Sequence, residues 1–161
     1  MPLNIRLARE DDLDALQELS VLAFEPISES FAEILGSQIF PLVYPDWNQL
    51  HRDHVLTFYR EEKSNLCVAE QDGILRGLIS YRLDDDKKQG EIEFLAVHPD
   101  YQSDGIGTHL NNFALAKMRE AGMQLAVVGT GGDDSHAPAR RAYEKVGFVP
   151  LPNVWYVQKL D

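Results

Sequence analysis

Three strand-like runs follow one another without an intervening helix, and this succession constrains the fold of the chain more than any other feature. The runs cover residues 66–70, 74–82 and 90–97. Asp72 and Gly73 separate the first two, and an Asp-Gly pair between apolar runs is a strong signal for a tight hairpin. Strands joined by such short turns pair antiparallel. The pattern therefore argues against a purely parallel, doubly wound sheet.

Two helices are predicted ahead of these strands. The first begins at the acidic residues 10–12, and its apolar face carries Leu13, Leu16, Leu19 and Leu22. The second runs from Asp46 to about Glu62, and its apolar stripe consists of Leu50, His54 (or Val55) and Phe58. Prolines interrupt residues 26–45 between them, where we expect an irregular loop.

Helices and strands alternate in the second half of the chain. A helix is predicted over residues 108–121 with Gly122 as its C-cap, followed by a strand at 124–128 and a short helix at 138–145. We expect residues 148–149 and 155–160 to close the sheet, which a first strand at residues 3–8 also joins. The prediction is one domain, residues 1–161, of α/β (α+β) class. Its mixed, mostly antiparallel sheet has about seven strands and is flanked by about four helices.

Composition and charge restrict the function. The net charge of −11 argues against nucleic-acid binding, which depends on Lys and Arg, and is compatible with a cationic substrate. No apolar run approaches the roughly 18–20 residues that span a bilayer, so we expect no membrane association. The single cysteine, Cys67, fits a reducing compartment, and we expect a cytoplasmic protein. His51 and His54 lack companion ligands, so no metal site is predicted.

A glycine-containing loop, residues 102–107, joins the third of these strands to the following helix. Its sequence is Gln-Ser-Asp-Gly-Ile-Gly, and glycines at a strand-to-helix junction leave backbone amides open to an anionic group. No Gly-Lys-Ser/Thr follows, so the loop is not a P-loop. Leu110 stands where a dinucleotide-binding fingerprint needs its third glycine, so that interpretation is excluded as well.

The remaining pattern, Gln-x-x-Gly-x-Gly, resembles the pyrophosphate-binding segment of the GNAT superfamily of acyl-CoA-dependent N-acetyltransferases. The preceding residues 95–101, Leu-Ala-Val-His-Pro-Asp-Tyr, are very close to the usual end of that family's fourth strand. Residues 139–148, Ala-Arg-Arg-Ala-Tyr-Glu-Lys-Val-Gly-Phe, resemble its second signature, a tyrosine-bearing helix that runs into Gly-Phe. The resemblance implies a three-layer GNAT-like domain that uses acetyl-CoA as cosubstrate.

The resemblance also implies which residues hold the cofactor. The strand before the loop would bind the pantetheine arm through its backbone, the loop amides would bind the pyrophosphate, and His136 stands where the family often has an Asn. These cofactor-binding residues are Leu95, Ala96, Val97, Gln102, Ser103, Asp104, Gly105, Ile106, Gly107, Thr108 and His136. Asp104 and Ser103 depart from the family's frequent basic residue and glycine, and we expect Asp104 to point into solvent. His136 could instead be part of the helix start, and Arg140 and Arg141 could reach the 3′-phosphate or form a solvated face.

Three residues are candidates for the chemistry. Tyr143 corresponds to the family's frequent general acid, which protonates the departing CoA thiolate. Glu91 matches the position where members often carry a glutamate base. Glu93 lies on the same face of the strand and is its rival, unless both simply form ion pairs or are solvated.

The acceptor is least determined by the sequence. Phe40, Tyr44 and Trp47 occupy the region past which the amine enters in the resembled fold, where they could contact a cation or anchor a loop. We expect transfer of the acetyl group directly to a primary amine of a small molecule. The alternatives are a protein or peptide N-acetyltransferase and a non-catalytic CoA-binding regulatory module. A homodimer is also compatible, because dimers are common in the family.

Overall fold

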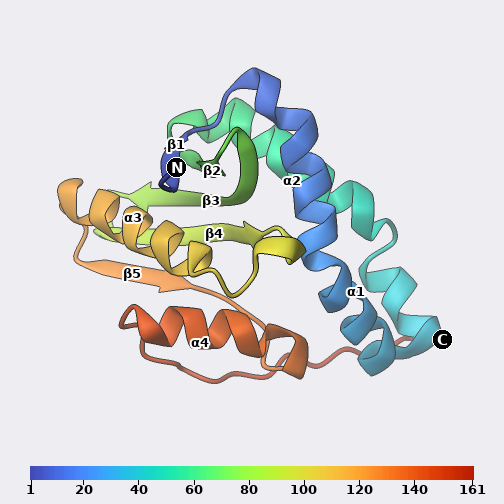
Figure 1. The fold of residues 1–161 in the computed structure, drawn as a ribbon. Coiled ribbons are helices and arrows are strands. Elements are labelled where there is room, and N and C mark those ends of the chain that lie inside the picture. Colours follow the sequence, from blue (N-terminus) through green and yellow to red (C-terminus); the bar gives the residue numbers. More distant parts are fainter.

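The computed structural model describes residues 1–161 and shows a mixed sheet with helices on both faces (Figure 1). Five strands and four helices make up the fold. In chain order they are β1 (Asn4–Leu7), α1 (Leu13–Val43), α2 (Trp47–Glu62), β2 (Leu66–Gln71), β3 (Ile74–Asp84), β4 (Gln89–Val97), α3 (Ile106–Glu120), β5 (Leu125–Val128) and α4 (Ala137–Lys145). No helix is long and apolar enough to cross a membrane.

The predicted succession of strands forms an antiparallel meander. The strand order is β1-β2-β3-β4-β5, in which the first four strands pair antiparallel and β5 pairs parallel to β4. Asp72 and Gly73 both have positive φ at the tip of the β2–β3 hairpin, as the favoured two-residue hairpin turn requires. The expected mixed, mostly antiparallel sheet is thus confirmed.

Two apolar layers hold the helices on the sheet. On one face, Leu16 and Leu19 of α1 and Val55 and Phe58 of α2 pack with strand residues such as Phe94. On the other face α3 supplies a second set of apolar side chains. That set consists of Ile106, Leu110, Ala114, Leu115 and Met118. Helix α4 lies along the β5 side of the molecule, below β5 in Figure 1.

The structure corrects the prediction of a loop over residues 26–45. Helix α1 continues to Val43 and changes direction at Gly36, whose φ of 76° and ψ of 170° are not helical. Pro26 and Pro41 both lie inside the helix. Aromatic packing holds the segment in place, because Phe31 contacts Tyr44 and Trp47. Packing therefore outweighs the local preference of proline here.

The structure also corrects the sheet's closing strands. Residues 148–149 and 155–160 form no strand, so the sheet has five strands rather than about seven. The segment after α4 runs back along that helix and ends beyond it (Figure 1). A smaller correction concerns α2, where His51 is buried and Leu50 is half exposed.

Candidate active site

The separation of β4 from β5 creates the main cleft of the molecule. The two strands pair only between Gln89–Ile92 and Leu125–Val128, although β4 continues to Val97. Glu93 is an extra residue in β4, because Ile92 pairs with Tyr81 while Phe94 pairs with Ser80. Such a bulge bends a strand and increases its twist. Beyond it, the β5-facing edge of β4 has no strand partner.

A cavity of about 640 Å³ fills this gap. We call it the central cleft, and it is lined by residues from α1, β4, the loop before α3, the start of α3, the residues after β5, and α4. The structure brings most of the sequence-predicted site residues together in it. These are Glu93, Leu95, Ala96, Val97, Gln102, Ser103, Gly105, Ile106, Gly107, Thr108, His136 and Tyr143.

The free edge of β4 presents backbone donors to the central cleft. The His98 amide donates to the Arg76 carbonyl oxygen on the β3 side, at 2.8 Å. Because backbone N–H groups alternate between the two edges of a strand, the amides of Leu95 and Val97 point to the opposite side. That side is the gap left by β5.

The start of α3 supplies a second group of donors. The first α-helical hydrogen bond runs from the His109 amide to the Gly105 carbonyl at 3.0 Å, so the amides of Ile106, Gly107 and Thr108 have no backbone partner. Helix starts carry a partial positive charge of about +0.5, so these amides suit an anion. Gly105 has φ 77°, and a side chain added there would be strained.

Gln102 and Ser103 shape the loop that leads to these amides. The Gln102 side-chain amide donates to the Val97 carbonyl at 3.3 Å and so ties the loop to the end of β4. Ser103 has φ 77°, a left-handed conformation that glycine adopts most easily. Asp104 is exposed and is not among the residues that line the cleft, an orientation consistent with the solvent-facing one expected.

Tyr143 enters the central cleft from α4. Its side chain is buried and packs edge-on against Phe148, with ring centroids 5.8 Å apart. The hydroxyl makes no hydrogen bond within the chain, and it is not sealed from solvent. Burial raises the pKa of Tyr143 to about 12, which keeps the phenol protonated at neutral pH. The side chain is thus available as a hydrogen-bond and proton donor.

The loop before α4 is held by a dense set of polar contacts. The Asp133 carboxylate accepts hydrogen bonds from Ser30 of α1 at 2.7 Å, from Ser135, and from His136 Nδ1 at 2.5 Å. Burial by itself would raise the pKa of Asp133, but these donors together hold that pKa well below its usual range. The carboxylate therefore remains charged and joins the loop to α1.

Arg140 takes part in the same network. Its guanidinium donates to the carbonyl oxygens of Gly131 and Asp133 at 2.6 and 2.7 Å. It is thus a structural residue of this loop rather than a solvated one. Arg141 and Lys145 are the cationic residues of α4 that line the central cleft.

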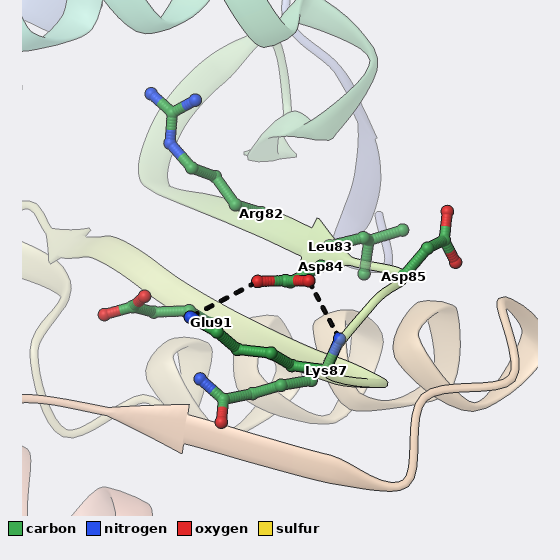
Figure 2. Close-up of a pocket in the computed structure, with 7 residues that line it drawn as sticks. Arg82, Leu83, Asp84, Asp85, Lys87 and Glu91 are labelled. Carbon is green, nitrogen blue, oxygen red and sulfur yellow. Dashed lines mark hydrogen bonds and ion pairs between the residues drawn. The ribbon is translucent and has the colours of Figure 1, made fainter.

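The two candidate bases differ in position. Glu91 lies outside the central cleft, at a surface hollow near the β3–β4 hairpin end, beside Arg82, Asp84 and Lys87 (Figure 2). Glu93 does line the cleft, but Arg82 Nε lies 3.3 Å from its carboxylate oxygen. The bulge in β4 separates the two glutamates' surroundings despite their spacing of two residues.

The aromatic residues predicted to border an acceptor site pack mainly on one another. Tyr44 contacts both Phe40 and Trp47, and none of the three lines the central cleft. Instead α1 lines the cleft through residues that the sequence placed at the end of a helix or in a loop. They are Ala23, Phe24, Pro26 and Ile27. Their position on the cleft could not be predicted from the sequence, because it depends on the continuation of α1 past Pro26.

The remaining nucleophiles and histidines lie away from the cleft. Burial raises the pKa of the Cys67 thiol to about 11, so it is not an activated thiolate. His51 packs against Phe24 and Trp47 with centroids 4.6 Å apart in each pair. The structure brings together no group of three His, Cys, Asp or Glu residues that could hold a metal ion.

Open amides at a helix start, an unpaired strand edge and a buried tyrosine thus surround one cleft, and comparison with known proteins shows the family of the chain. The model of the acetyltransferase (GNAT) family matches residues 24–148. The chain is similar to S-(2-succino)cysteine N-acetyltransferase of Bacillus subtilis (strain 168), at 33% identity over 150 residues covering 89% of this chain and 82% of that protein. The chain belongs to the GNAT family.

Solved structures show the same fold. The PaiA N-acetyltransferase of Thermoplasma acidophilum, determined in complex with coenzyme A, superimposes with a TM-score of 0.73 at 21% identity, covering 92% of this chain and 91% of that one. A GNAT acetyltransferase of Brucella melitensis in complex with acetyl-CoA gives a TM-score of 0.62 at 23% identity, covering 92% and 84%. The expected GNAT-like architecture is therefore confirmed.

Proposed function

We propose that this N-acetyltransferase transfers the acetyl group of acetyl-CoA directly to a primary amine of a small molecule. One observation carries the proposal. A single cleft joins the open amides of α3, the unpaired edge of β4 and the hydroxyl of Tyr143. Direct transfer requires all three in one place, since the thioester must be held, polarised and given a proton.

The pyrophosphate of CoA fits the start of α3. The amides of Ile106, Gly107 and Thr108 lack internal partners, and a phosphate oxygen is the kind of acceptor that such amides bind. Gly107 leaves room in front of them, because a Cβ built there meets only Val97 Cγ2 at 3.9 Å. Arg141 and Lys145 of α4 also line the cleft and add positive charge to it. Asp104 faces solvent and keeps its negative charge away from the phosphates.

The pantetheine arm and thioester fit along β4. The amides of Leu95 and Val97 face the cleft, so one of them can donate to the thioester carbonyl as negative charge develops on its oxygen. A donor in such a position is worth about 3–4 kcal/mol of transition-state stabilisation. The bulge at Glu93 is the feature that opens this edge.

We assign to Tyr143 the protonation of the sulfur of the departing CoA. The thiolate of a free thiol has a conjugate acid near pKa 8.5, so it becomes a good acceptor only as the C–S bond breaks. Burial keeps the phenol protonated until that moment, but it also raises the pKa of Tyr143 above that of the thiol, so the proton passes along a direct hydrogen bond as the thiolate charge develops. We assign Tyr143 the role of general acid because its side chain lines the cleft.

The acceptor amine enters between α1 and α4. That side of the cleft carries Phe24, Pro26 and Ile27, so it favours an acceptor with an apolar portion. The similar B. subtilis protein is named for S-(2-succino)cysteine, which makes S-substituted cysteines a sensible first class of acceptor to try. The α-amine of such a compound is a primary amine of the kind proposed.

A thiol-release assay tests this function. Purified chain with acetyl-CoA is presented with S-substituted cysteines, other amino acids, polyamines, aminoglycosides and short peptides. We expect CoA release with a small amine above the rate of acetyl-CoA hydrolysis. Greater activity on peptides would assign the enzyme to peptide acetylation. Acetyl-CoA binding without transfer across the whole panel would favour the regulatory module.

A further inference from the structure

The structure contains a side-chain pair at the central cleft that matches a general base better than either glutamate does. His136 is buried apart from its cleft side, and its Nδ1 lies 2.5 Å from an Asp133 carboxylate oxygen. An ionised carboxylate can only accept, so Nδ1 carries a proton. In the neutral ring Nε2 is then the unprotonated nitrogen.

His136 Nε2 is open to the cleft. It makes no hydrogen bond within the chain, and it is not sealed from solvent as the Nε2 atoms of His51 and His54 are. His136 directly precedes α4, and Tyr143 lies seven residues later, two turns along the same face of that helix. The imidazole and the phenol therefore enter the cleft from one wall.

Several contacts fix the position of Asp133. Ser30 and Ser135 donate to Asp133, Arg140 holds its carbonyl, and a Cβ on Gly131 would lie 2.3 Å from His136 Nδ1. The glycine is thus required for the loop to close around the imidazole. Such second contacts fix the ring's orientation and its tautomer.

We propose that His136, oriented by Asp133, is the general base that deprotonates the acceptor ammonium. This rests on the proposed function. Nε2 takes a proton from the ammonium, and the amine nitrogen then forms a bond to the acetyl carbon while the C–S bond breaks. Tyr143 gives its proton to the sulfur, and the nitrogen's second surplus proton returns to the tyrosine through solvent. The imidazolium releases its proton to water, which balances the reaction.

The charged surroundings of His136 are few. Asp133 lies on its own turn. The other titratable or charged groups that line the same cleft are Glu93 of β4, Tyr101 of the segment after β4, and Arg141, Tyr143 and Lys145 of α4. From helix α1, Ser30 and Phe31 contact this pair, and Ala23, Phe24, Pro26 and Ile27 line the cleft; all of these side chains are uncharged. An imidazole is also a more suitable base than a carboxylate for an amine near neutral pH, because its ordinary pKa of about 6.5 is closer to that of the ammonium.

The variants His136→Asn and Asp133→Asn test this assignment. Asn replaces His136 with the residue that the family often has there, so a cofactor contact would survive while a base would not. We expect His136→Asn to bind acetyl-CoA as the parent does but to lose turnover about 100-fold or more. Asp133→Asn should lower kcat with little change in the KM for acetyl-CoA, because the imidazole loses the carboxylate that fixes its tautomer and orientation.

Controls keep the outcome separate from that of the proposed function. His109→Asn, at an exposed position of α3 outside the cleft, should leave turnover unchanged. Ring-nitrogen NMR of the parent should show His136 protonated at Nδ1 when neutral, a result independent of activity. Full activity of His136→Asn with an unchanged pH profile would overturn the assignment of His136 as the general base. An inactive parent enzyme would instead overturn the proposed function.

Discussion

At the residue scale, two glycines near α3, Gly77 and Gly107, differ in what their missing side chains allow. Gly77 of β3 allows α3 to approach the sheet, because a Cβ there would lie 3.0 Å from Leu110 Cδ1 and 3.2 Å from Ile106 Cγ2 of α3. Gly107 has no such neighbour, and a Cβ there would be in ordinary contact at 3.9 Å from Val97. One glycine therefore serves packing, and the other keeps the amides of α3 accessible.

We expect Gly107→Ala to leave the free energy of unfolding unchanged or to raise it by up to about 1 kcal/mol, since alanine favours helix. The KM for acetyl-CoA should nevertheless rise at least about tenfold, because the methyl group stands in front of the phosphate-binding amides. Urea unfolding and steady-state kinetics measure the two effects. Gly77→Ala is the matched control and should lose stability by roughly 1–3 kcal/mol. An unchanged KM in Gly107→Ala would contradict the proposed binding of the pyrophosphate by the amides at the start of α3.

Tyr143 gives a second prediction at this scale. Tyr143→Phe keeps the ring and its contact with Phe148 but removes the hydroxyl. Affinity for CoA should be retained, while kcat should fall at least about tenfold because the thiolate leaves without its acid. Binding is measured by calorimetry and turnover by thiol release. Equal turnover in the variant would remove the assignment, and a loss of CoA affinity would show a packing role instead.

At the element scale, the sequence patterns correctly predicted the turns and helix ends that depend on the backbone preferences of single residues. The Asp72–Gly73 turn, the left-handed Gly122 after α3 and the strand–loop–helix junction at Gly105 all depend on backbone conformations that few residues adopt. The cleft residues of β4 and the loop could therefore be placed from the sequence. Glu93 could be named as a candidate, although nothing local showed that it forms a bulge.

The elements that sequence patterns missed are those decided by long-range contacts. Pro26 and Pro41 indicated a loop, yet α1 persists because its later turns pack on Tyr44 and Trp47. Asp133 is joined to Ser30, which precedes it by 103 residues, so its role beside His136 could not be found from spacing. The strand-forming composition of residues 155–160 is real, but a strand needs a neighbour, and within one copy of the chain it has none.

At the scale of the whole molecule, two histidines, the buried His51 and the half-buried His54, connect α1, α2 and β4. His51 stacks on Phe24 and lies 5.7 Å from Phe94, and His54 stacks on Phe94 at 4.8 Å. Burial, together with the neighbouring His54, lowers the pKa of His51 to about 4. Burial also lowers the pKa of His54, with Arg82 contributing. Both rings are therefore neutral in the folded protein at neutral pH.

This arrangement makes the fold sensitive to mild acid. Below the unfolded-state pKa of about 6.5 the unfolded chain binds a proton at His51 that the folded chain does not bind until about pH 4. The contribution of His51 to the free energy of unfolding is therefore fully present above pH 6.5 and is lost as the pH drops from 6.5 toward 4. The loss due to His51 reaches roughly 3 kcal/mol at the lower end.

His51→Phe should weaken this dependence. Phenylalanine keeps the ring stacking, cannot be protonated, and removes a buried Nε2 that has no hydrogen-bond partner. Thermal unfolding followed by circular dichroism at pH 7 and pH 5 should show a smaller drop in Tm for the variant than for the parent. His109→Asn, at an exposed site, should behave as the parent does. The range above pH 5 also avoids the titration of carboxylates such as Asp12, whose hydrogen bond from Arg6 lowers its pKa further. An equal drop in Tm for parent and variant would show that groups other than His51 cause the acid sensitivity.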